Sequence, residues 1–252
     1  MKATFLHHEK PLLTTMVQAM TPERALELMT LAKQEGTDAL GVQFCQFLPE
    51  YRNEQTYRRI IEAAGDMPLY ATNYRLCVNA DTPYEAIADE LILLARCGAT
   101  LCDVMADYYD PQPSGQSNDP AAVAKQKELV NALHAEGAEV LLSAHLNDRF
   151  YTAEEVIELA LQQQERGADI VKLVNQSADM AQQIENIRIA ALLKEKLDVP
   201  YLYLCGGECS ILRRIGGQLG CCMYLCVQQR DKLATPFQPL LRKMRAITDN
   251  FS

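Results

Sequence analysis

The chain has 252 residues, of which 48% are hydrophobic and 23% are charged, a composition typical of a globular protein with a large core. Its formal net charge of -9 and a pI near 5.0 disfavour general binding to nucleic acid or to an anionic membrane. No apolar run approaches the roughly 18 residues of a membrane-spanning helix, and residues 1–11 lack the apolar segment of a secretion signal. We therefore expect a soluble, cytoplasmic protein.

The nine cysteines do not follow the spacing of a metal site. No CxxC pair occurs, and no histidine accompanies the cysteines of the C-terminal region. Because free cysteine packs as a small apolar side chain, the sequence predicts buried, reduced thiols. No metal and no cofactor are expected.

A β-rich apolar run followed by an amphipathic helical stretch occurs eight times along the chain, at intervals of about 30 residues. In chain order, the expected strands are 12–20, 39–47, 68–75, 100–108, 139–145, 170–174, 201–205 and 221–227. The expected helices are one that opens at residues 21–23, then 54–64, 84–96, 125–135, 153–166, 178–197, 210–219 and 236–247.

The boundaries of these elements carry recognisable signals. Thr21 and Thr152 are suitable cap residues, and acidic residues after Thr152 suit the positive end of a helix. Glycines end several helices just before the next strand, at positions 36, 65, 98, 137 and 167. The polar segment 110–119 is the longest linker, and we expect it to lie over one mouth of the molecule.

Eight such units predict an α/β protein in which residues 1–252 form a single (β/α)8 TIM barrel. An open, doubly wound sheet is the alternative, but that fold usually has a glycine-rich turn after its first strand. Here the corresponding turn, residues 18–21, contains no glycine. The barrel is therefore preferred.

Lys172 interrupts a strand, 169–174, that is otherwise mostly β-branched and apolar. A lysine whose ammonium group reaches the barrel rim would need no functional explanation. An amine that points into the barrel instead loses solvation, which favours the neutral form that can attack a carbonyl group. Because buried, unpaired lysines are rare, we favour the functional interpretation.

His145 ends the strand that precedes the lysine strand. Neighbouring strands lie about 4.8 Å apart, so the two side chains can meet at the barrel mouth. A histidine that only bonds a backbone carbonyl is the alternative. Beside Lys172, an imidazole that titrates near neutrality predicts an acid–base group.

Arg213 and Arg214 lie near the start of the helix after the seventh strand, where one of them can point back over the mouth. A guanidinium group there suits a carboxylate substrate, although two exposed surface arginines are an equal alternative. Arg75, at the end of the third strand, is a second candidate for anion binding.

These residues resemble the type I 3-dehydroquinate dehydratases, which form a Schiff base on a barrel lysine. Residues 168–172 look like the lysine strand of that family, and 143–145 like the end of its histidine strand. Residues 207–220 are similar to its loop and helix after strand seven, and 236–238 to its mobile loop after strand eight.

The resemblance implies a cofactor-free enzyme for a small carboxylate substrate, with dimerisation plausible for the family. It makes Lys172 the nucleophile, His145 the general base and acid, Arg213 the carboxylate clamp and Gln238 a contact from the lid.

The first half of the chain differs from that family. Gly41 and Gln43 stand where the family has an acidic residue and an arginine, Arg75 is a displaced candidate, and Met105 replaces a glutamate. We keep Gln43 and Arg75 among the predicted substrate contacts.

The sequence thus predicts a dehydratase, a carbon–oxygen lyase, for 3-dehydroquinate or a related hydroxy-keto carboxylic acid. The alternatives are a class I aldolase that uses the same lysine, and a barrel that binds a small carboxylate without turning it over.

Overall fold

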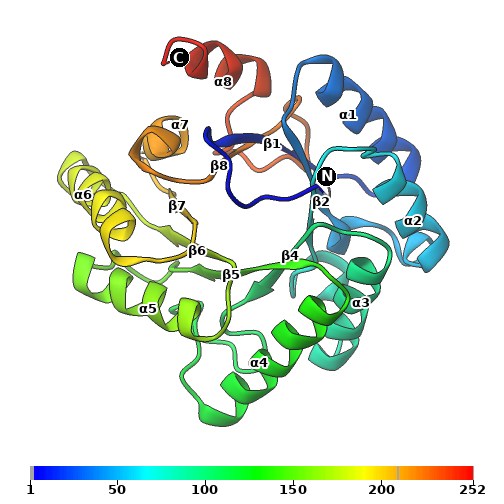
Figure 1. The fold of residues 1–252 in the computed structure, drawn as a ribbon, viewed down its shortest axis with the longest axis horizontal. Coiled ribbons are helices and arrows are strands. Elements are labelled where there is room, and N and C mark those ends of the chain that lie inside the picture. The colour runs from blue at the N-terminus through cyan, green and yellow to red at the C-terminus, as the bar shows by residue number, and fades with distance from the viewer. Residues whose placement is uncertain (1–2, 209, 252) are drawn as a thin grey trace.

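The computed structural model describes residues 3–208 and 210–251, and its eight parallel strands form a nearly closed barrel with helices outside (Figure 1). The strands are β1 Leu12–Val17, β2 Ala39–Gln43, β3 Leu69–Thr72, β4 Leu101–Met105, β5 Glu139–His145, β6 Ile170–Asn175, β7 Tyr201–Cys205 and β8 Met223–Cys226. The α-helices are α1 Pro22–Gln34, α2 Glu54–Glu62, α3 Tyr84–Arg96, α4 Pro120–Ala135, α5 Ala153–Glu165, α6 Met180–Lys196, α7 Leu212–Ile215 and α8 Leu241–Thr248.

The order of the strands confirms the barrel. It runs β7-β6-β5-β4-β3-β2-β1-β8, so β1 lies between β2 and β8 and each pair of neighbours is parallel. A doubly wound sheet would reverse its strand order instead. Among the described residues β7 and β8 share no ladder, but the Cys222 N–H donates to the Tyr201 carbonyl across this seam, at 2.9 Å.

Most strands are shorter than predicted, whereas β5 and β7 have the predicted bounds. The expected strand 39–47 stops at Gln43 because residues Phe44–Gln46 turn into a 3-10 helix. The predicted start of the last helix at residue 236 was wrong. The chain first pairs with Val227, whose N–H donates to the Pro239 carbonyl, and α8 begins only at Leu241.

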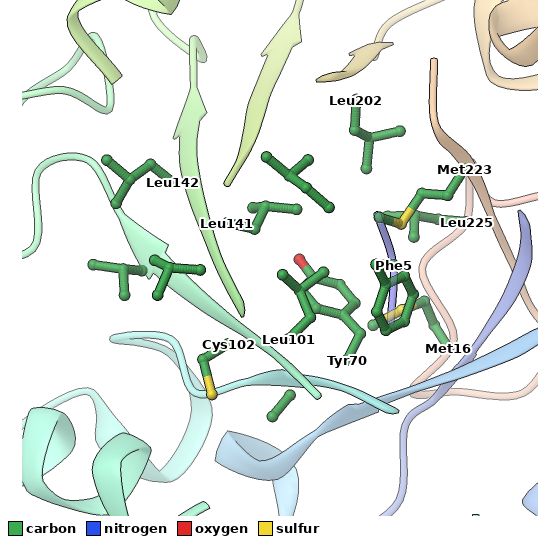
Figure 2. Packing of buried hydrophobic residues seen from close by; sticks show 14 of the residues in the cluster. Phe5, Met16, Tyr70, Leu101, Cys102, Leu141, Leu142, Leu202, Met223 and Leu225 are labelled. Carbon is green, nitrogen blue, oxygen red and sulfur yellow. The ribbon is translucent and has the colours of Figure 1, made fainter. Parts of the chain in front are cut away.

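Large apolar side chains fill the barrel interior (Figure 2). Phe5, from the segment before β1, lies edge-on to Tyr70 with 6.3 Å between ring centroids. The N–H of Phe5 donates to the carboxylate of Glu139 at the start of β5, at 2.8 Å. The N-terminal segment therefore covers the end of the barrel where the strands begin, and the opposite end is left for the site.

Six of the eight described cysteines are buried, as predicted. Cys77 is exposed and Cys222 is partly exposed, so the prediction was wrong for these two; Cys209 lies outside the described residues. No described group of three or more His, Cys, Asp or Glu side chains is arranged to hold a metal ion. Within residues 3–208 and 210–251, no helix is both long and apolar enough to cross a bilayer.

Candidate active site

A cavity of about 610 Å³ lies at the ends of the strands where their C-termini meet, the position of active sites in barrels of this kind. All of the residues that the sequence predicted for the site line it: Gln43, Arg75, His145, Lys172, Arg213 and Gln238. The structure thus brings together six side chains from widely separated parts of the chain.

Strands β5 and β6 carry the two central residues. Their register places Ser143 opposite Lys172 and His145 opposite Val174. Between these strands, α5 starts with a capping box at Thr152, and the chain then turns at Gly167 with φ 95°, which favours glycine. Both signals lie in the local sequence, so the start of β6 can be predicted from the sequence alone.

Lys172 is 3% exposed and points into the barrel. The expectation of an unpaired amine was wrong. Its ammonium nitrogen lies 3.0 Å from Oδ2 of Asp103, in an ion pair between β6 and β4. It also donates to the hydroxyl oxygens of Tyr74 at 2.8 Å and Tyr70 at 3.1 Å. A buried charge needs a partner, and β4 supplies one.

Asp103 is the centre of this network and is 1% exposed. It accepts hydrogen bonds from Ser143 and Tyr74, each at 2.6 Å, and from Tyr70. Burial by itself would raise the pKa of this carboxyl, but the Lys172 ammonium and the hydroxyl donors outweigh burial and lower it. Burial and the nearby carboxylate raise the pKa of both tyrosines well above the usual value, so they act as neutral donors.

Asp103 and the two tyrosines were not predicted from the sequence. A signal existed, because Asp103 and Lys172 are opposite charges inside two apolar strands that both pair with β5. Parallel strands of a barrel bring such residues to the same interior, where only paired charges are stable. The tyrosines gave no comparable signal, since tyrosine is common in strands.

His145 is half-buried, and its ring has no hydrogen-bond partner among the described residues. Its ring and the ring of Tyr74 meet edge to face, with 5.8 Å between centroids. Burial, and then the charges of Lys172 and Arg213, lower its pKa to about 4, although Asp103 opposes the shift. The imidazole is therefore neutral near pH 7 and can accept a proton.

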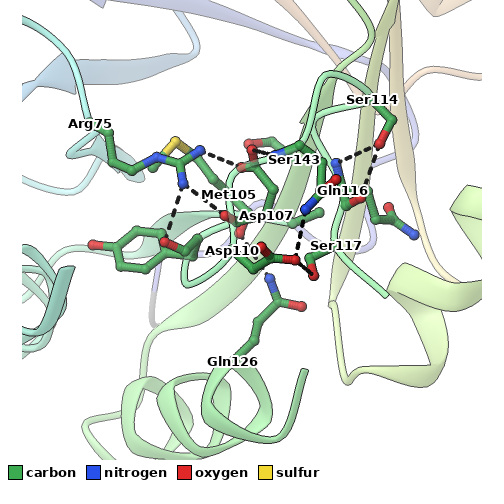
Figure 3. A network of polar contacts seen from close by, with 12 residues as sticks. Arg75, Met105, Asp107, Asp110, Ser114, Gln116, Ser117, Gln126 and Ser143 are labelled. Carbon is green, nitrogen blue, oxygen red and sulfur yellow. Dashed lines mark hydrogen bonds and ion pairs between the residues drawn. The ribbon is translucent and has the colours of Figure 1, made fainter. Parts of the chain in front are cut away.

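The segment between β4 and α4 covers this side of the mouth, as predicted (Figure 3). A Cβ at Gly115, where φ is 65°, would lie 2.6 Å from the backbone nitrogen of His145, so the segment packs directly on the histidine strand. The buried guanidinium of Arg166 holds the segment from below, through the carbonyls of Ala106 and Ser117. The position of His145 thus depends on the loop as well as on β5.

The two predicted anion-binding arginines differ. Arg75 forms an ion pair with Asp107 at 2.7 Å and also donates to the Asp107 carbonyl, as Figure 3 shows. Arg213 is buried, and its Nε donates to the Cys205 carbonyl at 2.8 Å, while its remaining nitrogens have no partner among the described residues. Arg214 is exposed to solvent. Arg213 is therefore the cation that faces the cavity without a counter-charge.

Two glutamines of the predicted set lie beside the loop after β8. Gln43 accepts from the side-chain amide of Gln18 at 3.0 Å, and Gln18 also bonds Thr235 through the backbone and the hydroxyl. Gln238 is buried, and its side-chain oxygen has no hydrogen-bond partner among the described residues. Arg230 fixes the loop by donating to the Gln238 carbonyl at 3.0 Å.

The family model of type I 3-dehydroquinase matches residues 79–250, while no curated protein matches the chain. Among solved structures, a 3-dehydroquinate dehydratase from Geobacillus kaustophilus HTA426 aligns with a TM-score of 0.83 at 15% identity, over 96% of this chain and 91% of that one. A type I 3-dehydroquinate dehydratase from Clostridium difficile, with covalently modified comenic acid, gives a TM-score of 0.80 at 15% identity, over 97% and 93%.

A 3-dehydroquinate dehydratase from Enterococcus faecalis gives a TM-score of 0.77 at 16% identity, over 99% of both chains. At these identities the solved structures establish the shared fold. The family model covers more than half of the sequence, including the lysine and histidine strands. The chain therefore belongs to the type I 3-dehydroquinase family.

Proposed function

We propose that this protein is a Schiff-base-forming dehydratase that acts on 3-dehydroquinate or a related hydroxy-keto carboxylic acid. Membership of the family supports a dehydratase, a carbon–oxygen lyase. The observation that carries the finer proposal is the buried amine of Lys172 at a cavity that it shares with a neutral His145 and with Arg213.

The first step is the loss of a proton from the ammonium group of Lys172. Asp103 and the Tyr74 hydroxyl are both within hydrogen-bond distance, and the carboxylate is ionised and able to accept the proton. The free amine then adds to the substrate ketone, protonated Asp103 returns the proton to the hydroxyl group of that adduct, and loss of water gives an iminium ion. Asp103 has two roles in this scheme: it pairs with the resting lysine at 3.0 Å and takes up its proton when substrate arrives.

The second step is elimination. The iminium draws electrons from the neighbouring carbon, so the neutral imidazole of His145 can remove a proton from it. The electron pair then expels the hydroxyl group on the next carbon, and the imidazolium returns the proton so that water leaves. Hydrolysis of the iminium releases the product and restores Lys172.

Binding of the substrate carboxylate falls to Arg213, whose free guanidinium nitrogens can form charge-assisted hydrogen bonds. Gln238, with its unpaired side-chain oxygen, is the proposed contact from the loop after β8. Arg75 is a weaker candidate, because Asp107 already neutralises it.

The proposal can be tested by adding borohydride in the presence of candidate ketones and locating the reduced adduct by mass spectrometry. We expect a single adduct on Lys172 with 3-dehydroquinate or a related keto acid, and none on the Lys172→Met variant. Lys125→Met is the matched control, because Lys125 is 57% exposed whereas the Lys172 side chain is 4% exposed.

The outcome separates the alternatives. Labelling with loss of water from 3-dehydroquinate supports the dehydratase. Labelling by another ketone with cleavage of a carbon–carbon bond supports an aldolase. Failure of every candidate ketone to label Lys172 would contradict the Schiff-base mechanism and favour a barrel that only binds carboxylates.

A further inference from the structure

The charges around the cavity set the charge of its ligand. Lys172 is balanced by Asp103 and Arg75 by Asp107, and His145 is neutral. Among the described residues that line the cavity, Arg213 is left without a carboxylate partner. One unbalanced cation at a buried site matches one carboxylate group, and a second anionic group would have no partner.

Polar side chains on the β1–β4 side of the cavity already have partners. The amide of Gln18, just after β1, joins Gln43 on β2 to Thr235 of the loop after β8, and Asp103 on β4 accepts from Ser143 of β5. Tyr74 accepts from Lys172 and donates to the same carboxylate. Few buried donors or acceptors on this side remain for hydroxyl groups of a ligand.

Apolar atoms occupy the rest of this side. Met16 and Met105 line the cavity at 7% and 8% exposure, and Met16 lies among the interior side chains of Figure 2. A Cβ at position 41 would lie 2.3 Å from the sulfur of Met16. Glycine at that position therefore lets the methionine fill the space, and the wall is built from thioether rather than polar groups.

From this charge balance and this wall we infer the substrate class: a keto acid with one carboxylate and an apolar body, bearing the hydroxyl that leaves and few others. The inference rests on the proposed function, because it takes Arg213 as the carboxylate site. A ligand hydroxyl group that faces Met16 and Met105 loses its hydrogen bonds to water and gains no new partner. By the usual cost of an unsatisfied polar group, each such hydroxyl weakens binding about tenfold.

The test uses two ketone-free probes that differ only in hydroxyl groups. Cyclohexanecarboxylate and quinate, the same ring acid with added hydroxyls, are titrated into the full chain by calorimetry at pH 7. We expect cyclohexanecarboxylate to bind at least about tenfold more tightly. Neither probe can form an imine, so the result is independent of the borohydride experiment.

Two variants locate the effect. Met105→Gln and Met16→Gln each place an amide in the wall at similar volume, and we expect either to reduce the preference for cyclohexanecarboxylate several-fold. Met180→Gln is the matched control, because Met180 is 63% exposed on α6. If one cavity variant fails to fold, the other performs the same test.

Equal or tighter binding of quinate to the wild-type protein overturns the inference while leaving the Schiff-base proposal in place. It is also overturned if neither probe binds, or if both folded cavity variants keep the wild-type ratio. In contrast, if no ketone forms an adduct with Lys172, the proposed function is contradicted, while the inference about the apolar wall is not.

Discussion

Strands β5 to β7 and strands β1 to β4 contribute to one cavity, yet they present different side chains to it. The first group, with the helix after β7, supplies His145, Lys172 and Arg213. The second supplies Met16, Gln43 and Met105. The family model begins at residue 79, after β3, so the strands that depart most from the family pattern lie largely outside the match.

This division has a physical basis in the barrel. Each strand contributes its own end to the common mouth, so side chains on one set of strands can change without moving those on the other. Asp103 on β4 and Tyr70 on β3 are exceptions, because both bond the lysine of β6. The proposed chemistry and the proposed substrate choice are therefore separable except at the partners of Lys172.

The largest effect should come from breaking the pair. Lys172→Met removes the proposed nucleophile, so adduct formation should be lost completely. It also leaves the buried carboxylate of Asp103 without its cation, which should cost about 3–5 kcal/mol of unfolding free energy. Urea unfolding at pH 7 measures this cost.

A double variant, Lys172→Met with Asp103→Asn, is the control for that experiment. Asparagine keeps hydrogen-bonding capacity towards Ser143 and the tyrosines without the charge, so much of the stability should return. Simple additivity of the two single losses would argue that the ion pair contributes nothing.

His145→Ala separates imine formation from elimination on the β5 side. Lys172 keeps its partners, so borohydride should still trap an adduct. Turnover should fall by about 100-fold or more, the usual share of general acid–base catalysis. Wild-type turnover in this variant would remove His145 from the mechanism, whereas loss of trapping would indicate that it acts before elimination.

The two regions also differ in how well the sequence predicted them. The alternation of strands and helices predicted the barrel, and glycines such as Gly137 predicted the start of β5, because these signals are local. Lys172 was recognised as a polar residue inside an apolar strand, and His145 as a polar residue at the end of a strand, where the barrel mouth lies. Their meeting in one cavity followed from the geometry of parallel neighbours.

The partners of Lys172 were not predicted, because they depend on contacts across the barrel. Asp103 and the tyrosines of β3 and the following loop reach the lysine from strands that are not adjacent to β6. The same holds for Arg75. Its sequence position predicted a substrate contact, but in the structure it forms an ion pair with Asp107. Charge pairing inside a barrel is a property of the closed ring, which no single segment encodes.

The pKa of His145 gives a stability test of its burial. The folded protein lowers this pKa from about 6.5 to about 4, so the unfolded chain binds the proton first as pH falls. Above about pH 6.5 the imidazole is neutral in both states and the folded protein has its full stability. As pH falls from 6.5 to 4, the free energy of unfolding should decrease by about 2–3 kcal/mol.

Urea unfolding from pH 4 to 7 measures this slope, with His145→Asn as the comparison. The variant lacks the titrating ring, so its stability should depend less on pH in this interval while other groups contribute equally to both proteins. Identical pH profiles would mean that His145 is not buried with a lowered pKa.

The smallest effect should separate the two arginines of the cavity. Arg213→Met removes the cation that lacks a counter-charge, and binding of cyclohexanecarboxylate should weaken by about tenfold or more, the typical value of a charge-assisted hydrogen bond. Arg75→Met should change the same affinity by less than about threefold, because Asp107 already holds that guanidinium group at 2.7 Å. The loss of Arg75 should appear instead in the stability of the loop that carries Asp107. Calorimetric titration of both variants decides between the two arginines. A larger loss of affinity for Arg75→Met would place the carboxylate site on the β3 side of the cavity instead of the β7 side, and would contradict the proposed division of roles between the two groups of strands.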